Sequence, residues 1–411
     1  MIRVRGNKWL FGLVFSGLCV TGSFAVAQVN SHANEPIGTV EQIYDGKLTP
    51  DIAINTYRNI DRLFPTRVVK AGKTPSALPE AKLPLETMIK HEQGGKTYDL
   101  YDFLYMNNIT GLLVMKDGKV VYEIYQRGNS KDTRWMSMSV VKSIASTLVG
   151  AAIRDGYIKS LDDNVVKYVP VLAGTAYDGV SVRNVLMMSS GVKWNETYTD
   201  PKSDRRDLLR AQMAQQRDGA MAVMAKLPRA AEPGTVNNYS TGETQVLAEI
   251  VYGAVGKPLS EYLSEKIWIP YGMEADANWW LDSPDGLEIG GSGLSATLRD
   301  YARFGQFFLD GGLAGGKQVL PEGWIEEAST SKTLPDGKTL NYAYMWWPVR
   351  SGSDAAKADK SFTASGIFGQ YIHINPAKRI VIAITGAAPK PVGKYGVDPF
   401  AFFDSVARAL D

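Results

Sequence analysis

The chain has 411 residues, of which 45% are hydrophobic, and its 45 basic and 43 acidic side chains give a formal net charge of +2. This length allows one large domain or two closely packed ones, with enough apolar residues for a substantial core but too few for a polytopic membrane protein. The near-neutral charge gives no electrostatic reason to expect nucleic acid as a partner.

The first 27 residues have the pattern of an export signal. Three basic residues within positions 3–8 precede an apolar run from Trp9 to Val20, and residues 25–27 form an A-x-A cleavage site. The apolar run is short for a membrane span, although an uncleaved anchor is the alternative. We expect a periplasmic or secreted protein with no membrane span after cleavage. The only cysteine, Cys19, lies in this segment, so the mature chain would have no disulfide.

The residues from 28 to 95 carry no motif that indicates a function. Six prolines, at positions 36, 50, 65, 75, 79 and 84, interrupt any long element, so we expect a wrapping N-terminal extension with short helices. A hairpin follows, with β-rich runs at Leu112–Lys116 and Val120–Gln126 joined by Asp117-Gly118. An apolar helix then runs from Ser139 to Ala152 and ends before Gly156.

Helices predominate over residues 161–285, and strands return near the C-terminus. We expect helices at Val182–Met188, Arg206–Lys226, Thr241–Tyr252, Leu259–Trp268, Leu298–Asp310 and Phe400–Leu410, and strands at Tyr342–Val349, Ile367–Ile374 and Arg379–Thr385. Strands at both ends of the chain with helices between them predict an α+β fold with an inserted all-α region. Residues 96–160 and 286–411 would form the α/β part, and residues 161–285 the helical part.

The segment Ser139-Val-Val-Lys142 opens the buried helix and offers the chemistry of a serine nucleophile. Residues three apart share a helix face, so the Lys142 amine would lie close to the Ser139 hydroxyl. Burial favours the uncharged amine, which is the form that a lysine base needs. The alternative is that Ser139 only caps the helix, since serine is a common N-cap.

Other hydrolase chemistries have little support in this sequence. The histidines are His32, His91 and His373, and His373 lies on an apolar strand, where a core role is the simpler interpretation. There is no Gly-x-Ser-x-Gly segment, which disfavours a Ser–His–Asp hydrolase, and no cluster with metal-ligand spacing. We expect neither a metal nor an organic cofactor.

Tyr239 is a second candidate, in the segment Tyr239-Ser240-Thr241. Ser240 and Glu243 fit a capping box for the next helix, but this leaves Tyr239 unexplained at the loop–helix junction. A tyrosine beside a lysine favours its phenolate form and could move protons.

Taken together, these segments resemble the serine β-lactamase and penicillin-binding protein superfamily, in particular its class-C-like esterase and amidase branch, which includes the 6-aminohexanoate-dimer hydrolases. The likeness covers roughly residues 105–410. Besides the two segments above, it rests on Ser189-Ser190-Gly191-Val192, Gly290-Gly-Ser-Gly293, Arg299–Arg303, Trp346-Trp347 and Gly366–Gln370.

The resemblance implies a β-lactamase-like fold with an antiparallel sheet flanked by helices. It implies Ser139 as nucleophile, Lys142 as base and Tyr239 as proton shuttle, with the backbone N–H groups of Ser139 and of Ile367, on the edge strand, as oxyanion hole. By the same resemblance Tyr198, Trp347, Ser365 and Gly366 would contact the substrate, although packing explains the two aromatic residues equally well.

One departure from the family bears on the substrate. β-Lactamases and peptidoglycan peptidases carry Lys-Thr-Gly where this chain has Ala364-Ser365-Gly366, so the base that helps bind a carboxylate is missing. The resemblance therefore implies an amidase or esterase that acts on a small molecule through an acyl-enzyme. The alternatives are a D,D-peptidase or class C β-lactamase and a non-catalytic penicillin-binding-like module. The sequence does not specify the oligomeric state.

Overall fold

The computed structural model describes residues 1–2, 31–393 and 396–411. The predicted export signal at residues 1–27 therefore lies outside the described residues, apart from its first two positions. Residues 32–411 form one compact unit. The internal limits at residues 95/96, 160/161 and 285/286 stay predictions. None of the helices in the described ranges is long and apolar enough to cross a membrane.

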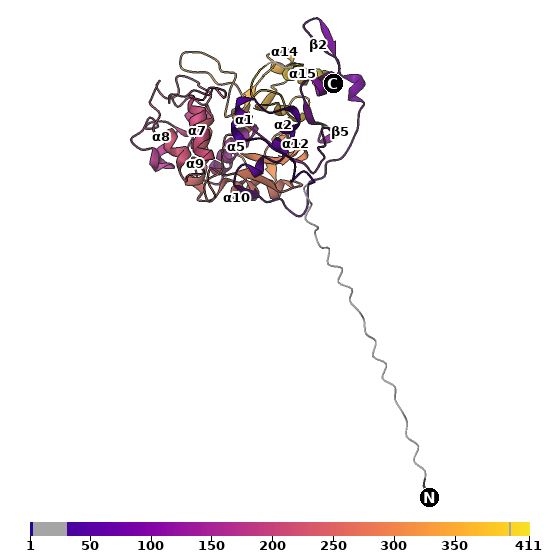
Figure 1. Ribbon diagram of the computed structural model, residues 1–411, viewed down its shortest axis with the longest axis horizontal. Helices are drawn as coiled ribbons and strands as arrows, with labels where there is room; N and C mark the ends of the chain where they lie inside the picture. Colours follow the sequence, from indigo (N-terminus) through magenta and orange to yellow (C-terminus); the bar gives the residue numbers. More distant parts are fainter. Residues whose placement is uncertain (3–30, 394–395) are drawn as a thin grey trace. The chain divides into compact units, whose positions relative to one another are not determined.

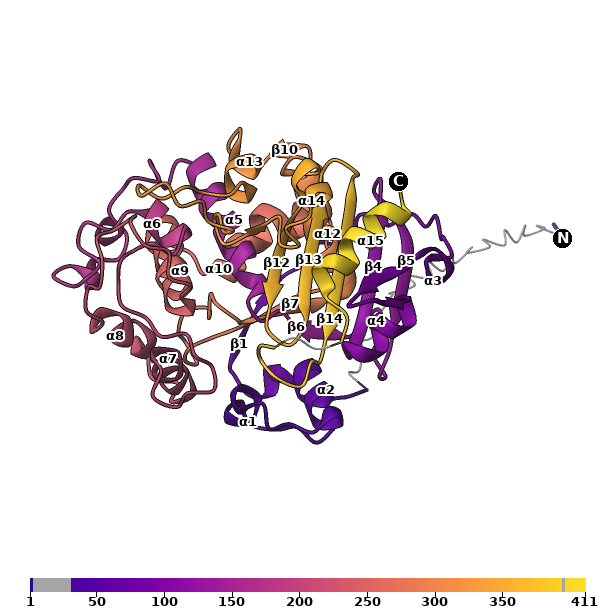
Figure 2. The ribbon, with the colours of Figure 1, turned by 90° about the horizontal axis from the view of Figure 1, so that it is seen from above.

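A six-stranded antiparallel sheet forms the larger β element, in the order β11-β12-β13-β14-β4-β5 (Figure 2). Its strands are β4 (Ile109–Lys116), β5 (Lys119–Tyr125), β11 (Trp347–Pro348), β12 (Phe362–Gly366), β13 (Gln370–Asn375) and β14 (Ile380–Gly386). The predicted hairpin is confirmed: Asp117 and Gly118 have φ of 51° and 75° between β4 and β5, as the two central residues of a type I′ turn require.

Helices cover both faces of this sheet, so its strands are apolar on both sides. Leu113 and Met115 join the core shared with α5 (Val140–Arg154) and α12 (Leu298–Leu309). Leu112 and Val114, which alternate with them, join the core shared with α4 (Leu100–Met106) and α15 (Pro399–Ala409). The α+β prediction is confirmed, with the antiparallel sheet between two helical layers.

The strand that precedes Ser139 belongs to a second, four-stranded antiparallel sheet. Its order is β1-β7-β8-β6, with β1 (Thr66–Val69), β7 (Ala277–Trp280), β8 (Leu294–Thr297) and β6 (Arg134–Met136). The indole N–H of Trp135 in β6 donates to Gln370 Oε1 in β13 over 3.0 Å, which ties the two sheets together. Ser139 thus comes three residues after the end of a strand that pairs with β8 on one side and is tied to the larger sheet through Trp135.

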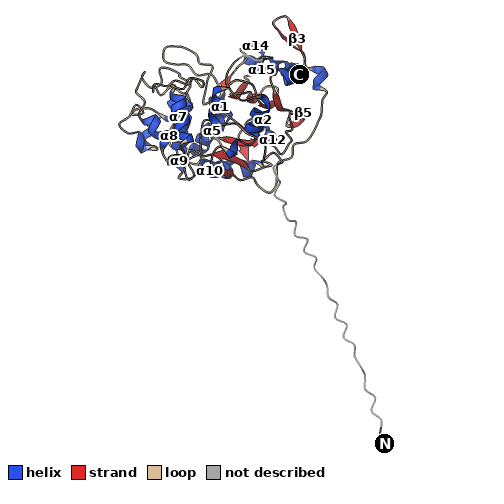
Figure 3. Ribbon diagram, viewed as in Figure 1, coloured by secondary structure: helices blue, strands red, loops and turns tan. Residues whose placement is uncertain are grey.

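The helical region lies beside the sheet, with α7, α8 and α9 near one another (Figures 1 and 3). Its elements are the 3₁₀ turns η2 (Val165–Lys167) and η3 (Pro170–Leu172), the helices α6 (Val182–Leu186), α7 (Asp204–Met213), α8 (Gly219–Ala225), α9 (Thr241–Val255) and α10 (Leu259–Leu263), the π-helical turn η4 (Ser264–Trp268) and α11 (Ile269–Tyr271). Helix α9 packs against α5, which brings residue 241 to residue 142.

The remaining elements are short. They are α1 (Val40–Asp45), α2 (Pro50–Arg58), η1 (Ile60–Arg62), α3 (Leu85–Met88), β2 (His91–Gln93), β3 (Lys96–Tyr98), β9 (Leu313–Ala314), β10 (Lys317–Gln318), α13 (Trp324–Ser329) and α14 (Asp354–Ala358). The short helices predicted for residues 28–95 are confirmed. That extension also supplies β1 and the β2–β3 hairpin, which were not predicted because the prolines around them argued against regular structure.

Three predicted elements are corrected. The helix predicted at Arg206–Lys226 is two helices, because Gln215 and Asp218 adopt left-handed conformations between them. The strand predicted at Tyr342–Val349 is reduced to Trp347–Pro348, because Met345 has φ of 61° and the Ala343 N–H bonds to Trp346 O in a tight turn. Ile367 lies in the turn after β12 and not in a strand. Strand β12 itself is not the edge of the sheet, because β11 pairs with its outer side.

Candidate active site

Ser139 sits between β6 and α5, at the position that precedes the first helical residue. Its side chain makes no capping hydrogen bond, so a purely capping role does not explain it. The preceding residue, Met138, has φ of 42°, a left-handed conformation that turns the chain sharply into the helix. Only 8% of Ser139 is exposed, and the residue lines a cleft.

Lys142 is fully buried one turn along α5, with only oxygen partners that carry no charge. Its Nζ lies 3.2 Å from Ser139 Oγ, 3.1 Å from Thr241 Oγ1 and 2.5 Å from Gly291 O. Burial lowers the pKa of Lys142 to about 7, while Glu196 opposes this shift and Arg205 adds to it. The predicted neighbourhood of the serine hydroxyl and the lysine amine is therefore present, with an amine that is readily deprotonated.

Glu196 and Thr241 determine how the hydrogen atoms around Lys142 are distributed. The Thr241 hydroxyl donates to Glu196 Oε1, and the Thr241 N–H donates to Glu196 Oε2 over 2.9 Å. Thr241 Oγ1 can therefore only accept from the amine, as can the carbonyl of Gly291. A neutral amine has two hydrogens and one lone pair. With both hydrogens used in this way, the lone pair is left facing the Ser139 hydroxyl.

Tyr239 lies between this network and the aromatic wall of the cleft. Its ring is 5.6 Å from Lys142 Nζ and stacks on Trp347 with ring centroids 5.6 Å apart. Burial raises the pKa of Tyr239, and a hydrogen bond with Ser139 only partly counteracts this. The expectation of a phenolate is therefore wrong for the free protein, because desolvation and the charge of Glu196 raise the pKa of Tyr239 and favour its protonated form.

The two backbone N–H groups predicted to form the oxyanion hole are those of Ser139 and Ile367. In the described part of the chain, neither the Ser139 nor the Ile367 N–H has a backbone or side-chain acceptor. Gly366 packs so closely that a Cβ on it would lie 2.7 Å from Ser137 O and 3.0 Å from Ser139 N. The missing side chain lets the end of β12 approach the Ser139 amide, and the next residue is Ile367.

The cleft has a volume of about 810 Å³ and collects the predicted substrate-contact residues. Tyr198, Trp347, Ser365 and Gly366 all line it together with Ser139, Tyr239 and Ile367. Along β12 the side chains alternate, so that Ala364 is buried in the core while Ser365 is half-exposed in the cleft. The first position of the Lys-Thr-Gly equivalent thus offers no polar group to a substrate.

Sequence reasoning missed four groups of the site. Gly291 lies within the Gly290–Gly293 segment, Thr241 follows Tyr239, and Glu196 is two residues from Tyr198, so each was close to a recognised motif. Arg350 lines the cleft as well and had no signal in the sequence. Its position depends on the turn after β11, where Val349 has φ of 44°.

Two other titratable residues have structural explanations. His373 is buried, shares a 2.9 Å hydrogen bond with Thr363 and stacks on Phe403, and burial lowers its pKa to about 3. The core role predicted for it is confirmed. The capping box is only half formed, because Ser240 accepts from the Glu243 N–H while the Glu243 carboxylate bonds to the Ser190 hydroxyl. Burial raises the pKa of Glu243 to about 8.

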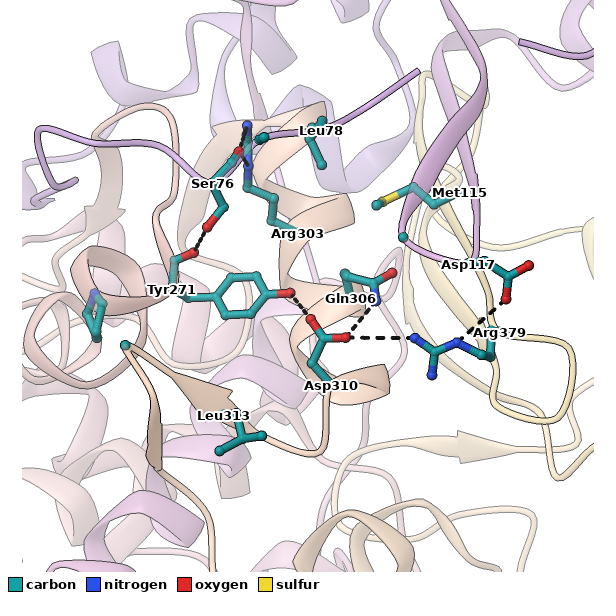
Figure 4. Close-up of a pocket in the computed structure, with 14 residues that line it drawn as sticks. Ser76, Leu78, Met115, Asp117, Tyr271, Arg303, Gln306, Asp310, Leu313 and Arg379 are labelled. Carbon is teal, nitrogen blue, oxygen red and sulfur yellow. Dashed lines mark hydrogen bonds and ion pairs between the residues drawn. The ribbon is translucent and has the colours of Figure 1, made fainter. Parts of the chain in front are cut away.

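A second cavity, of about 470 Å³, lies away from these residues, and its polar groups bond to one another (Figure 4). Asp310 accepts from the Tyr271 hydroxyl over 2.7 Å and from Gln306 over 2.8 Å, and it lies 4.0 Å from Arg379. Arg303 donates to Ser76 O over 2.9 Å. This cavity contains no serine–lysine pair, and among the described residues no group of three or more His, Cys, Asp or Glu side chains could hold a metal ion.

Comparison with known proteins agrees with this geometry. Residues 106–401 match the family model described as Beta-lactamase. The chain is 32% identical over 373 residues to the 6-aminohexanoate-dimer hydrolase of Paenarthrobacter ureafaciens, covering 86% of this chain and 91% of the relative.

Solved structures share the fold. The "Putative 6-aminohexanoate-dimer hydrolase from Bacillus anthracis" superposes with a TM-score of 0.74 at 24% identity, covering 86% of this chain and 91% of that chain. A class C beta-lactamase superposes with a TM-score of 0.55 at 21% identity, covering 76% and 93%. The predicted family and β-lactamase-like fold are confirmed: the chain belongs to the beta-lactamase family of hydrolases.

Proposed function

We propose that this protein is a serine hydrolase that cleaves an amide or ester bond of a small molecule through an acyl-enzyme on Ser139. It would act as an amidase or carboxylesterase similar to the 6-aminohexanoate-dimer hydrolases. The contact that carries the proposal is the 3.2 Å approach of Lys142 Nζ to Ser139 Oγ, in a site where the amine has no carboxylate partner. Because of the predicted signal at residues 1–27, we expect this activity in the periplasm or outside the cell.

In the first step the lone pair of Lys142 takes the Ser139 proton while Oγ bonds to the substrate carbonyl carbon. The carbonyl oxygen becomes negative and lies between the N–H groups of Ser139 and Ile367. Each such preorganised donor typically stabilises the transition state by about 3 kcal/mol. The free N–H groups and the close approach at Gly366 support this role.

In the second step the bond to the leaving group breaks. Tyr239 donates its hydroxyl proton to the departing nitrogen or oxygen, and the Lys142 ammonium returns a proton to Tyr239. Serine is then acylated, the leaving group carries one added hydrogen, and both basic groups regain their starting forms. Water repeats the sequence on the acyl-enzyme, releasing the acid and free Ser139.

The test is covalent labelling of purified protein with a fluorophosphonate probe, followed by mass spectrometry of the modified peptide. We expect one label, on Ser139, which Ser139→Ala abolishes. Ser143→Ala is the matched control: this serine lies one turn along the same helix, but its hydroxyl donates to Met345 O over 2.7 Å, so labelling should persist.

The same preparation separates the alternatives. Turnover of nitrophenyl esters without labelling by a fluorescent penicillin supports the amidase or esterase. Stable penicillin labelling at Ser139 would instead support a D,D-peptidase, and hydrolysis of the penicillin that Ser139→Ala abolishes would support a β-lactamase. Failure of the fluorophosphonate to label folded protein would indicate a module that retains the fold without the chemistry.

A further inference from the structure

The cleft contains a cation that the proposed reaction does not use. Arg350 lines the same cavity as Ser139, and its guanidinium carbon lies 3.9 Å from the ring centre of Trp347 and 5.0 Å from that of Phe400. No carboxylate among the described residues forms an ion pair with it. Burial lowers the pKa of Arg350, and Asp398 is the nearby carboxylate that counters this.

Aromatic contacts hold the Arg350 side chain in place without satisfying it. A guanidinium against an aromatic face is attracted through its plane, which leaves its N–H groups free to bond at their edge. Asp398 forms no hydrogen bond or ion pair with Arg350 in the described residues, and its Oδ1 instead accepts from the Phe400 N–H over 2.9 Å at the start of α15. The guanidinium is half-buried and lines the cleft, so its unused donors can bond to an anionic ligand in place of water.

Arg350 is connected to the reacting centre through side chains in contact. Trp347 contacts the guanidinium and also stacks on Tyr239, whose ring lies 5.6 Å from Lys142 Nζ. The other charged side chains lining the described part of the cleft are Glu92, Glu196, Lys390 and Asp398, and Glu196 lies next to the Ser139–Lys142 pair through its bond to Thr241. The cleft therefore has an acidic group beside the nucleophile and a basic group farther along its aromatic wall.

We infer that Arg350 binds a carboxylate of the substrate and so makes this site selective for amides and esters that carry one negative charge. This inference rests on the proposed hydrolase function. Planar guanidinium and carboxylate groups match as two parallel hydrogen bonds. One guanidinium that shares the cleft with three carboxylates, Glu92, Glu196 and Asp398, and with Lys390, suits a monoanion better than a phosphate with two charges. Arg350 would thus supply the cation that Ala364 cannot.

The experiment compares kcat/KM for two pairs of esters. In one pair the carboxylate is on the acyl part: the 4-nitrophenyl monoester of glutarate against 4-nitrophenyl butyrate. In the other it is on the leaving group: 4-acetoxybenzoate against phenyl acetate. We expect Arg350→Gln to lower kcat/KM for the anionic member of at least one pair by about 10- to 100-fold, the usual range for a lost charged hydrogen bond. The neutral member should change by less than about threefold.

Two further variants separate recognition from packing. Arg350→Lys keeps the charge and should retain part of the preference for the anionic ester. Arg379→Gln removes a guanidinium from the second cavity, where Arg379 lies 3.6 Å from Asp117, and should leave both ratios unchanged. Equal losses on neutral and anionic esters in Arg350→Gln, or unchanged ratios in both pairs, would overturn the inference.

A binding measurement keeps the inference testable if the proposed function fails. Should the parent protein hydrolyse none of these esters, calorimetric titration with hippurate and with its uncharged amide still reports on Arg350. Tighter binding of hippurate than of the amide, lost in Arg350→Gln, supports the carboxylate site. Equal binding of the two compounds, or no effect of the substitution, contradicts it.

Discussion

The basic side chains of the cleft at Ser139 and those of the second cavity differ in whether they have carboxylate partners. In the second cavity Arg303 is 3.0 Å from both Glu274 and Asp300, and Arg379 has Asp117 and Asp310 as neighbours. In the cleft Lys142 contacts only uncharged oxygens, and Arg350 contacts aromatic rings. A buried cation without a counter-ion is costly. This contrast underlies the two proposed roles, proton transfer by Lys142, whose pKa burial lowers, and anion binding by Arg350.

Of the substitutions that test this difference, removal of the Lys142 amine should have the largest effect on activity. We expect Lys142→Met to lower turnover of a nitrophenyl ester by about 10,000-fold, as loss of one member of a catalytic unit commonly does. The apolar stem of lysine is replaced by a side chain of similar length, so circular dichroism should show a folded protein. Near-normal activity in a folded variant would remove Lys142 from the mechanism.

A smaller effect is expected from Tyr239→Phe, which keeps the stacking on Trp347 and removes the proton. Amide cleavage should slow by about 100-fold because an amine leaves only when protonated, whereas an activated ester should lose less than tenfold. Tyr342→Phe is the matched control, since Tyr342 also packs on Trp347, at 4.7 Å, but does not line the cleft. Equal losses on both substrates would argue against proton transfer by Tyr239.

The mildest perturbation is a change of pH. Burial lowers the pKa of Lys142 to about 7, so the reactive neutral amine predominates above that pH and is lost below it. We expect kcat/KM for a neutral ester to be half-maximal near pH 7 and to fall tenfold per unit at lower pH. Glu196 raises the pKa of Lys142, so Glu196→Gln should move the midpoint to lower pH. A midpoint that stays fixed, or moves upward, would contradict this assignment.

The parts of the site that are local in sequence could be predicted. Ser139 and Lys142 are one helical turn apart, and Tyr239 immediately precedes a helix start, so periodicity and capping place them without knowledge of the fold. The charge state of Tyr239 could not be predicted in this way, because burial by residues distant in the chain decides it.

Groups that arrive through tertiary contacts escaped prediction. Lys142 meets Thr241 and Gly291 across 99 and 149 residues, and no local pattern encodes such contacts. The aromatic-rich segment at 342–347 has strong strand propensity, yet a left-handed Met345 turns it so that Trp346 packs in the core and Trp347 faces the cleft. Arg350 follows from that turn, which is why its position could not be predicted.

The two N–H donors near Ser139 belong to different sheets: one follows β6 and the other follows β12. The distance between them is set by the close contact of Gly366 with the backbone of Ser137 and Ser139. Because Gly366 has no side chain, nothing there can adjust when one sheet moves against the other. A slight slip of one sheet against the other would spoil that spacing while leaving every strand intact. We therefore expect hydrolytic activity to be lost on heating several degrees below the temperature at which the protein unfolds. A substrate bound between the two sheets should raise the temperature at which activity is lost.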